Sequence, residues 1–119
     1  MKTHIIKLLL SSLILLGFSN SALSGEFWRT GNVIRILSGN ENFGKCMILM
    51  STKVLNGCPN NGWVSLDCAD KYSTGNSKNK LAIALTALAI NKKVSVKIDN
   101  TKKHNGYCVA TRIDIYSSN

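Results

Sequence analysis

The first hydrophobic segment of the chain is a run near the N-terminus. It covers residues 8–18 and follows lysines at positions 2 and 7. Ala22 and Ser24 then provide the small side chains that signal peptidase prefers at its cleavage site. A membrane-spanning helix would need about 18 or more uninterrupted apolar residues, and this run is shorter. The pattern therefore predicts a signal peptide, residues 1–24, that is removed from a secreted or periplasmic protein.

The remaining 95 residues form one small domain with five segments that have the pattern of β-strands. Two of them are continuous apolar or β-branched runs, and three alternate apolar with polar residues. Turn-forming Gly, Asn, Ser and Pro lie between most of them. The predicted strands are residues 33–37, 46–50, 63–68, 94–99 and 109–116.

One segment has the composition of a helix. Residues 81–90 are mostly Leu, Ala and Ile, and Ser77 can cap the N-terminus. Lys92 and Lys93 follow, where cations interact favourably with the helix dipole. The order of three strands, one helix and two strands predicts a mainly β fold, the OB-fold, which is a five-stranded, partly open barrel. An α+β sandwich with the helix on one sheet face is the alternative.

All four cysteines follow the signal peptide, so we expect them to form disulfides in an oxidising compartment. In the barrel, the second and third strands form a hairpin, which places Cys46 opposite Cys68. The third and fifth strands run parallel, which places Cys58 and Cys108 at the same end. A bond between Cys46 and Cys58 would join opposite ends of one strand, much further apart than the about 7 Å that a disulfide allows. We therefore predict the pairs Cys46–Cys68 and Cys58–Cys108.

The chain is strongly basic, with 15 Lys and Arg against 6 Asp and Glu and a formal charge of +9. Loss of Lys2 and Lys7 with the signal peptide lowers this charge to +7. Such a charge favours solubility and attracts anionic partners, but it does not determine the fold. A secreted protein seldom needs to hold cellular nucleic acid, so nucleic acid is not an expected partner.

The predicted helix is apolar on two sides. A projection at about 100° per residue groups Leu81, Leu85 and Leu88 on one stripe, with Ala84 beside them, and we expect this stripe to cover the barrel. The residues on nearly the opposite side are Ile83, Ala87 and Ile90. We predict that this second side contacts another subunit in a homo-oligomer, although a small domain also tolerates three exposed apolar side chains.

Catalysis has little support in the sequence. His104 is the sole histidine after residue 24, and its polar surroundings predict an exposed loop. Asp67 is predicted to point outward from a strand and Asp70 to lie in a loop, so they are not placed as a catalytic pair. The cysteine spacing lacks the close pairs of structural zinc sites, and no phosphate-binding loop is present. We predict no enzymatic activity, no cofactor and no metal.

Binding is the better class of function. Aromatic rings in loops can stack on sugar rings or bases, while amides and basic side chains contact hydroxyls or carboxylates. OB-folds bind oligosaccharides and oligonucleotides with one surface, so the fold alone does not select the ligand. For Trp63, core packing is an equally good interpretation. The candidate glycan-binding residues are Trp28, Arg29, Asn61, Trp63, Tyr72, Asn105 and Tyr107.

Several features occur in a familiar succession. A strand opens with a cysteine (Gly44-Lys45-Cys46-Met47-Ile48), another carries Cys68, and a helix leads into Asn91-Lys92-Lys93-Val94-Ser95-Val96-Lys97-Ile98 before a last strand entered through Cys108. In this order the chain resembles the OB-fold B subunits of bacterial toxins, especially the pertussis-like and subtilase-type cell-binding subunits. The resemblance implies a ring of five subunits, recognition of a cell-surface glycan and delivery of a separate catalytic A subunit. It transfers no individual sugar-binding residue.

These observations predict a secreted, non-enzymatic and oligomeric module that binds carbohydrate. The alternative is a monomeric secreted inhibitor, or another small binding protein, whose basic surface contacts an acidic partner.

Overall fold

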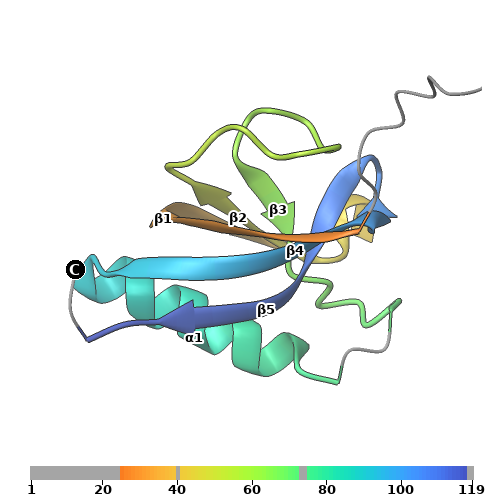
Figure 1. Cartoon of the computed structure of the whole chain (residues 1–119). Coiled ribbons are helices and arrows are strands. Elements are labelled where there is room, and N and C mark those ends of the chain that lie inside the picture. Colours follow the sequence, from red (N-terminus) through yellow and green to blue (C-terminus); the bar gives the residue numbers. More distant parts are fainter. Residues whose placement is uncertain (1–24, 40, 73–74, 118–119) are drawn as a thin grey trace, which may run out of the picture.

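The computed structural model describes residues 25–39, 41–72 and 75–117, and the predicted signal peptide lies outside this part of the chain. The order of elements agrees with the order predicted from the sequence. It is β1 (Glu26–Ser38), the short 3-10 helix η3 (Glu41–Phe43), β2 (Cys46–Met50), β3 (Trp63–Ser65), α1 (Ser77–Ile90), β4 (Lys93–His104) and β5 (Tyr107–Ile115) (Figure 1).

The five strands form a closed barrel in the order β1-β2-β3-β5-β4. Neighbouring strands are antiparallel except β3 and β5, which run parallel and meet at the pair Ser65 and Val109. This arrangement confirms the predicted OB-like barrel, and the sheet closes fully where a partly open one was expected. In Figure 1, α1 runs behind β5 along the lower side of the barrel, while the loop between β2 and β3 arches above the strands.

Strand β1 is much longer than predicted. Its first half, residues 26–32, pairs with β4, and its second half pairs with β2. The predicted strand begins only after Gly31, because this glycine interrupts the apolar pattern. A Cβ at Gly31 would lie 2.7 Å from the hydroxyls of Ser51 and Thr52, so glycine lets the following loop approach the strand. As a result, Trp28 stands on a paired strand instead of in a loop.

The barrel interior is filled by apolar side chains from alternate positions along the strands. Val94, Val96 and Ile98 of β4 are fully buried. Leu55, in the loop of residues 51–62, is also buried and closes one end of the barrel. Among the described residues, no helix is both long and apolar enough to cross a membrane.

The predicted orientation of the helix is only partly right, because Leu81 packs against the core and Leu85 and Leu88 do not. The residues of α1 buried against the barrel are Lys80, Ala84 and Ala87, whereas Leu85 is 50% and Leu88 39% exposed. Apolar residues surround the helix, so the projection contains no single dominant direction. Small alanines face the barrel, where they allow a close approach. Of the three residues predicted to contact another subunit, Ala87 is unavailable, Ile83 is half-buried and Ile90 is exposed.

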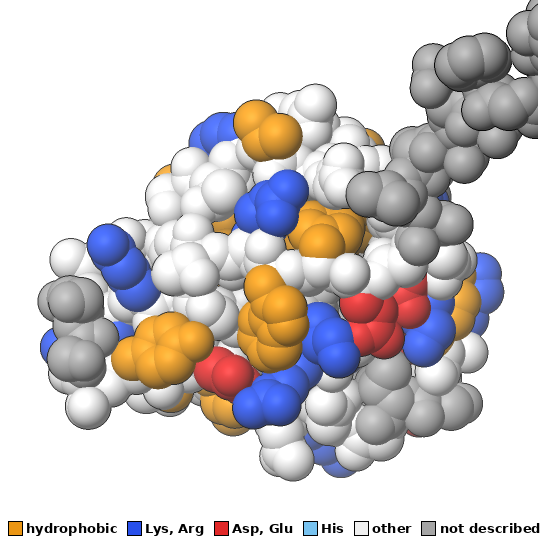
Figure 2. All heavy atoms as spheres, viewed as in Figure 1, with side chains coloured by type: hydrophobic (Ala, Val, Ile, Leu, Met, Phe, Trp, Pro, Cys, Tyr) orange, Lys and Arg blue, Asp and Glu red, His pale blue; other side chains and the backbone are white. Residues whose placement is uncertain are grey.

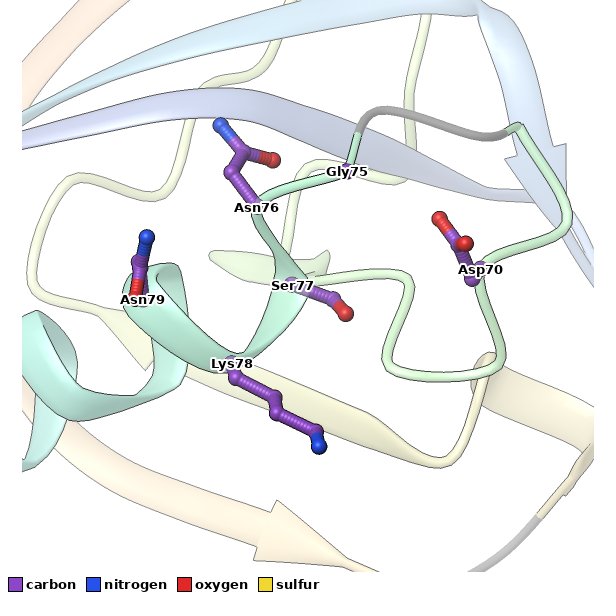
Figure 3. A pocket seen from close by; sticks show the side chains of 6 residues that line it. All are labelled: Asp70, Gly75, Asn76, Ser77, Lys78 and Asn79. Carbon is purple, nitrogen blue, oxygen red and sulfur yellow. The ribbon is translucent and has the colours of Figure 1, made fainter.

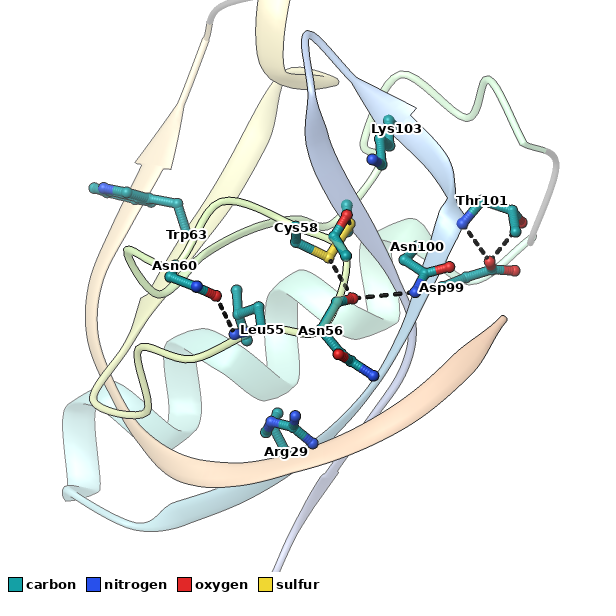
Figure 4. The surroundings of a disulfide bond; sticks show 12 residues. Arg29, Leu55, Asn56, Cys58, Asn60, Trp63, Asp99, Asn100, Thr101 and Lys103 are labelled. Atoms are coloured by element: carbon teal, nitrogen blue, oxygen red, sulfur yellow. Dashed lines mark hydrogen bonds between the residues drawn. A yellow bond between two sulfur atoms is a disulfide. The ribbon is translucent and has the colours of Figure 1, made fainter. Parts of the chain in front are cut away.

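Both predicted disulfides are confirmed. Cys46 and Cys68 have Cα atoms 5.5 Å apart, and Cys58 and Cys108 have Cα atoms 5.8 Å apart. The second bond ties the loop of residues 51–62 to the start of β5 (Figure 4). In the same loop, Asn56 accepts a hydrogen bond through its backbone carbonyl from Asn100 Nδ2 of β4, at 3.1 Å.

Candidate functional site

The outer surface of β1, β4 and β5 carries a group of polar and aromatic side chains that we call the Trp28 face. Along the strands, the side chains of this face alternate with side chains that point into the core. Cross-strand pairing places Trp28 beside Lys97, and Lys97 beside Arg112. The next row along the strands is Thr30, Ser95 and Asp114, and the preceding row contains Glu26 and Asp99. Three strands far apart in sequence therefore build one surface.

Trp28 is the large apolar side chain of this face and is 43% exposed. The Arg112 guanidinium carbon lies 5.6 Å from the centroid of the indole ring, within the range of a cation–π contact. Arg112 Nε donates a hydrogen bond of 2.8 Å to Asp114 Oδ1, and this bond raises the pKa of Arg112. The indole thus lies next to a fixed charged pair.

The remaining polar groups of the Trp28 face are also held by neighbours. Lys97 Nζ lies 2.6 Å from Glu26 Oε2, and the hydroxyls of Thr30 and Ser95 are 2.7 Å apart. Figure 2 views the molecule from the side of β4 and β5 and shows hydrophobic side chains beside both basic and acidic ones. The Trp28 face thus combines an aromatic ring with hydrogen-bond donors and acceptors.

Arg29, the next candidate along β1, makes contacts that hold the fold together. Its Nε donates to the carbonyl of Val54 at 2.9 Å and its Nη1 to the carbonyl of Trp28 at 2.8 Å, while the guanidinium lies 4.8 Å from the Phe27 ring centroid. Figure 4 shows the side chain near the loop of residues 51–62. Arg29 therefore fastens this loop to β1.

Trp63 and Asn61 lie at the start of β3. Asn61 Oδ1 accepts a hydrogen bond of 3.1 Å from the backbone N–H of Trp63, and Arg35 lies 5.8 Å from the centroid of the half-buried Trp63 ring. This second arginine–tryptophan pair is separate from the first. Arg35 and Trp28 are seven residues apart on β1, up to about 23 Å in an extended strand.

Tyr72, Asn105 and Tyr107 form a third group near the turn between β4 and β5. The Tyr72 hydroxyl donates to the Lys103 carbonyl at 2.6 Å and accepts from the Lys103 N–H at 2.9 Å. Tyr107 packs its ring on Phe43 with centroids 5.6 Å apart, and Asn105 occupies the exposed turn. The seven candidates therefore fall into three separate regions and do not form one site.

Two polar residues predicted to be exposed are buried instead. His104 is only 8% exposed, and its Nε2 lies in a hydrogen bond of 2.6 Å to Asp67 Oδ1. Asp67 turns inward because β3 ends at Ser65 and Asp67 takes a positive φ of 53°. Its carboxylate also accepts from the backbone N–H groups of Lys71 and Tyr72, both at 3.0 Å. Burial raises the pKa of Asp67, but these hydrogen bonds outweigh it and hold the pKa below its ordinary value.

Lys80 is a further buried charge that the sequence analysis missed. Its Nζ donates a hydrogen bond of 2.6 Å to the carbonyl of Ala110. Burial lowers the pKa of Lys80 to about 8, against the opposing attraction of Asp67 and Asp70. Lys80 anchors the first turn of α1 to β5.

An open pocket of about 330 Å³ lies where the chain enters α1 (Figure 3). Its lining residues are Asp70, Gly75, Asn76, Ser77, Lys78 and Asn79. Asn76 Nδ2 donates to the carbonyl of Thr111 at 3.2 Å, while its buried Oδ1 has no hydrogen-bond partner. Within the described part of the chain, no group of three or more His, Cys, Asp or Glu side chains is placed to hold a metal ion.

No protein-family model, no curated protein and no solved structure matches this chain. The function is therefore inferred from the geometry of the chain itself. The Trp28 face is the strongest candidate site, because it combines an exposed indole with hydrogen-bonding groups held by paired strands.

Proposed function

We propose that the protein is a secreted, non-enzymatic module that binds carbohydrate on a cell surface through the Trp28 face. The observation that carries this proposal is the exposed Trp28 indole beside Lys97 and Arg112, with Asp114 bonded to Arg112. A pyranose ring has an apolar face that suits an aromatic ring, and hydroxyls that donate and accept hydrogen bonds. The Trp28 face places an aromatic ring next to hydrogen-bonding groups, which suits both parts of the sugar.

The rigidity of the face supports this function. Its side chains stand on the central strand β4 and on the parts of β1 and β5 that pair with it, and four of them form two ion pairs within the face. Groups that are already ordered lose little conformational entropy when a ligand binds. A small ligand such as a sugar can then be held by few contacts.

Self-association is part of the proposal. Leu85 and Leu88, one turn apart, leave an apolar strip exposed on α1, on the side that was predicted to cover the barrel, whereas Ile90 is exposed on nearly the opposite side. Several copies of a weak sugar site bind a multivalent surface much more tightly than one copy. The resemblance to toxin B subunits favours a ring of five with a separate catalytic partner.

The two disulfides support the proposal that the protein is secreted. The two disulfides fit an extracellular or periplasmic location, because such bonds persist in oxidising compartments. Removal of residues 1–24 during export is the remaining element of this proposal, and N-terminal sequencing of the exported protein tests it.

A glycan array with the mature, oxidised protein tests the binding function. We expect binding by the wild-type protein and its loss in Trp28→Ala. Trp63→Ala is the matched control, since Trp63 also lies beside an arginine but belongs to another part of the barrel. A folded protein that binds no glycan overturns the proposal, and if it is also monomeric it supports a secreted inhibitor instead.

A further inference from the structure

We infer that the Trp28 face selects a neutral sugar over one that carries a carboxylate or sulfate. This inference rests on the proposed function and specifies the class of glycan. It runs against the overall charge, because the whole chain carries a formal +9 and would be expected to favour anions.

The local charges of the face differ from those of the chain. Its three rows contain two cations, Lys97 and Arg112, and three carboxylates, from Glu26, Asp99 and Asp114. Each cation is paired inside the face, Lys97 with Glu26 at 2.6 Å and Arg112 with Asp114 at 2.8 Å. With Lys102, which lies 3.9 Å from Asp99, the charges around the indole are balanced.

The third carboxylate of the face, that of Asp99, also has partners. Asp99 is buried, accepts hydrogen bonds from the N–H and hydroxyl of Thr101, and lies 3.9 Å from Lys102 Nζ. The next outward cation along β4 is Lys93, four residues from Lys97 and about 13 Å away in an extended strand. Lys97 and Arg112, the cations beside the indole on this face, thus already have carboxylate partners, and Arg29, the neighbour of Trp28 on β1, donates to the carbonyls of Val54 and Trp28.

An anionic sugar would need to displace one of these partners. If it replaced Asp114 at Arg112, the displaced carboxylate would remain close to the new negative charge, and this like-charge contact is unfavourable. A neutral sugar requires no displacement. The Asp114 carboxylate can accept several hydrogen bonds, and the Lys97 ammonium has three donors, so each can bind a hydroxyl while it keeps its partner.

The net charge acts mainly at longer range. At physiological ionic strength the Debye length is about 8 Å, so distant lysines have a weak influence on a ligand at the indole. The positive charge brings the protein to an anionic cell surface, and the local pairs determine which sugar is held there.

Matched ligand pairs test this inference. Isothermal titration or saturation-transfer NMR with the mature, oxidised protein would compare methyl glucoside and methyl galactoside with their C6 uronates, which have the same rings and an added carboxylate. Arrayed neutral oligosaccharides and their sialylated or sulfated forms extend the comparison. We expect the neutral member of a pair to bind about tenfold or more tightly, with little dependence on salt.

Asp114→Asn sharpens the test, because it removes the charge that neutralises Arg112 while it leaves the shape of the side chain. We expect weaker binding of the neutral sugar and stronger binding of the uronate. Asp70→Asn is the matched control, since Asp70 is an exposed aspartate near the start of α1 and should leave both affinities unchanged.

The outcomes separate this inference from the proposed function. Tighter binding of the acidic sugars, or an unchanged preference in Asp114→Asn, overturns neutral selection and leaves glycan binding intact. No binding of either class by the folded protein overturns glycan binding and the inference with it.

Discussion

His104 and Asp67, 37 residues apart in the chain, are joined inside the protein by a hydrogen bond of 2.6 Å between Nε2 and Oδ1. The bond connects the end of β4 to the segment that follows β3. Gly44 is required beside it, because a Cβ there would lie 2.6 Å from His104 Cδ2. Buried polar pairs of this kind favour one arrangement of the surrounding loops, since leaving either partner unpaired is costly.

The first prediction is that stability falls at acid pH through Asp67. The pKa of Asp67 is lowered in the folded protein by hydrogen bonds to its carboxylate, so the unfolded chain takes up the proton first as the pH falls. The stabilising contribution is therefore fully present above the unfolded pKa of about 3.9 and is lost as the pH falls through the folded pKa. Urea unfolding between about pH 6 and pH 2.5 measures this loss.

Asp67→Asn serves as the comparison for the acid experiment. It should unfold more easily at pH 6, by about 1–3 kcal/mol, because the network of donors loses its ionised acceptor. It should also lose less stability than the wild-type protein on acidification. Parallel pH profiles for the two proteins would contradict the assigned role of Asp67.

The second prediction concerns alkaline pH. Burial lowers the pKa of Lys80 from 10.5 to about 8, so between these values the unfolded chain binds more protons than the folded one. Stability should therefore rise as the pH increases from about 8 toward 10.5, by on the order of 3 kcal/mol at most. Chemical denaturation over this range measures the rise, and Lys80→Met, which cannot titrate, should lack it. An equal rise in Lys80→Met would assign the effect to other groups.

The barrel and its disulfides were predictable because their signals are local and periodic. Val94, Val96 and Ile98 show the alternation of a half-buried strand, and the cysteine pairing follows once the strands are ordered. His104 has the same parity as these core residues, so the alternation of β4 contained a signal for its burial. Its Lys- and Asn-rich surroundings indicated a loop instead.

The helix orientation and the site were less predictable for physical reasons. Apolar residues surround α1, so the buried side is set by how closely the alanines let it approach the barrel. Trp28 was identified by its type, but Lys97 and Arg112 were not. Their position beside Trp28 depends on the register of three strands, which the sequence does not specify.

The third prediction compares the two disulfides. Removing either pair with serine should cost about 2–4 kcal/mol, since each bond restricts the unfolded chain. Cys58–Cys108 closes a separation of 50 residues and Cys46–Cys68 one of 22. The loop-entropy relation then makes the first bond about 0.7 kcal/mol more stabilising. Urea unfolding of the two double-serine variants tests this order.

Loss of Cys58–Cys108 should also have a local effect. The loop of residues 51–62 would keep the hydrogen bonds of Arg29 and Asn100 but lose its covalent tie to β5. We expect faster amide hydrogen exchange in this loop than in β4, and no such change in the variant that lacks Cys46–Cys68. Equal protection of the loop in both variants would show that the hydrogen bonds alone hold it.

The last prediction addresses self-association through the exposed strip of α1. Leu88→Asp places a charge in the strip formed by Leu85 and Leu88, where it would be buried without a partner in an oligomer. We expect the native mass of the mature protein to fall to that of a monomer, with little change in the unfolding midpoint at low protein concentration, because Leu88 lies largely outside the core. Val54→Asp, at a more exposed apolar position in the loop of residues 51–62, is the control and should keep the wild-type mass. If the wild-type protein is itself monomeric in analytical ultracentrifugation, the strip does not join copies of this chain, and the multivalent binding proposed above loses its basis.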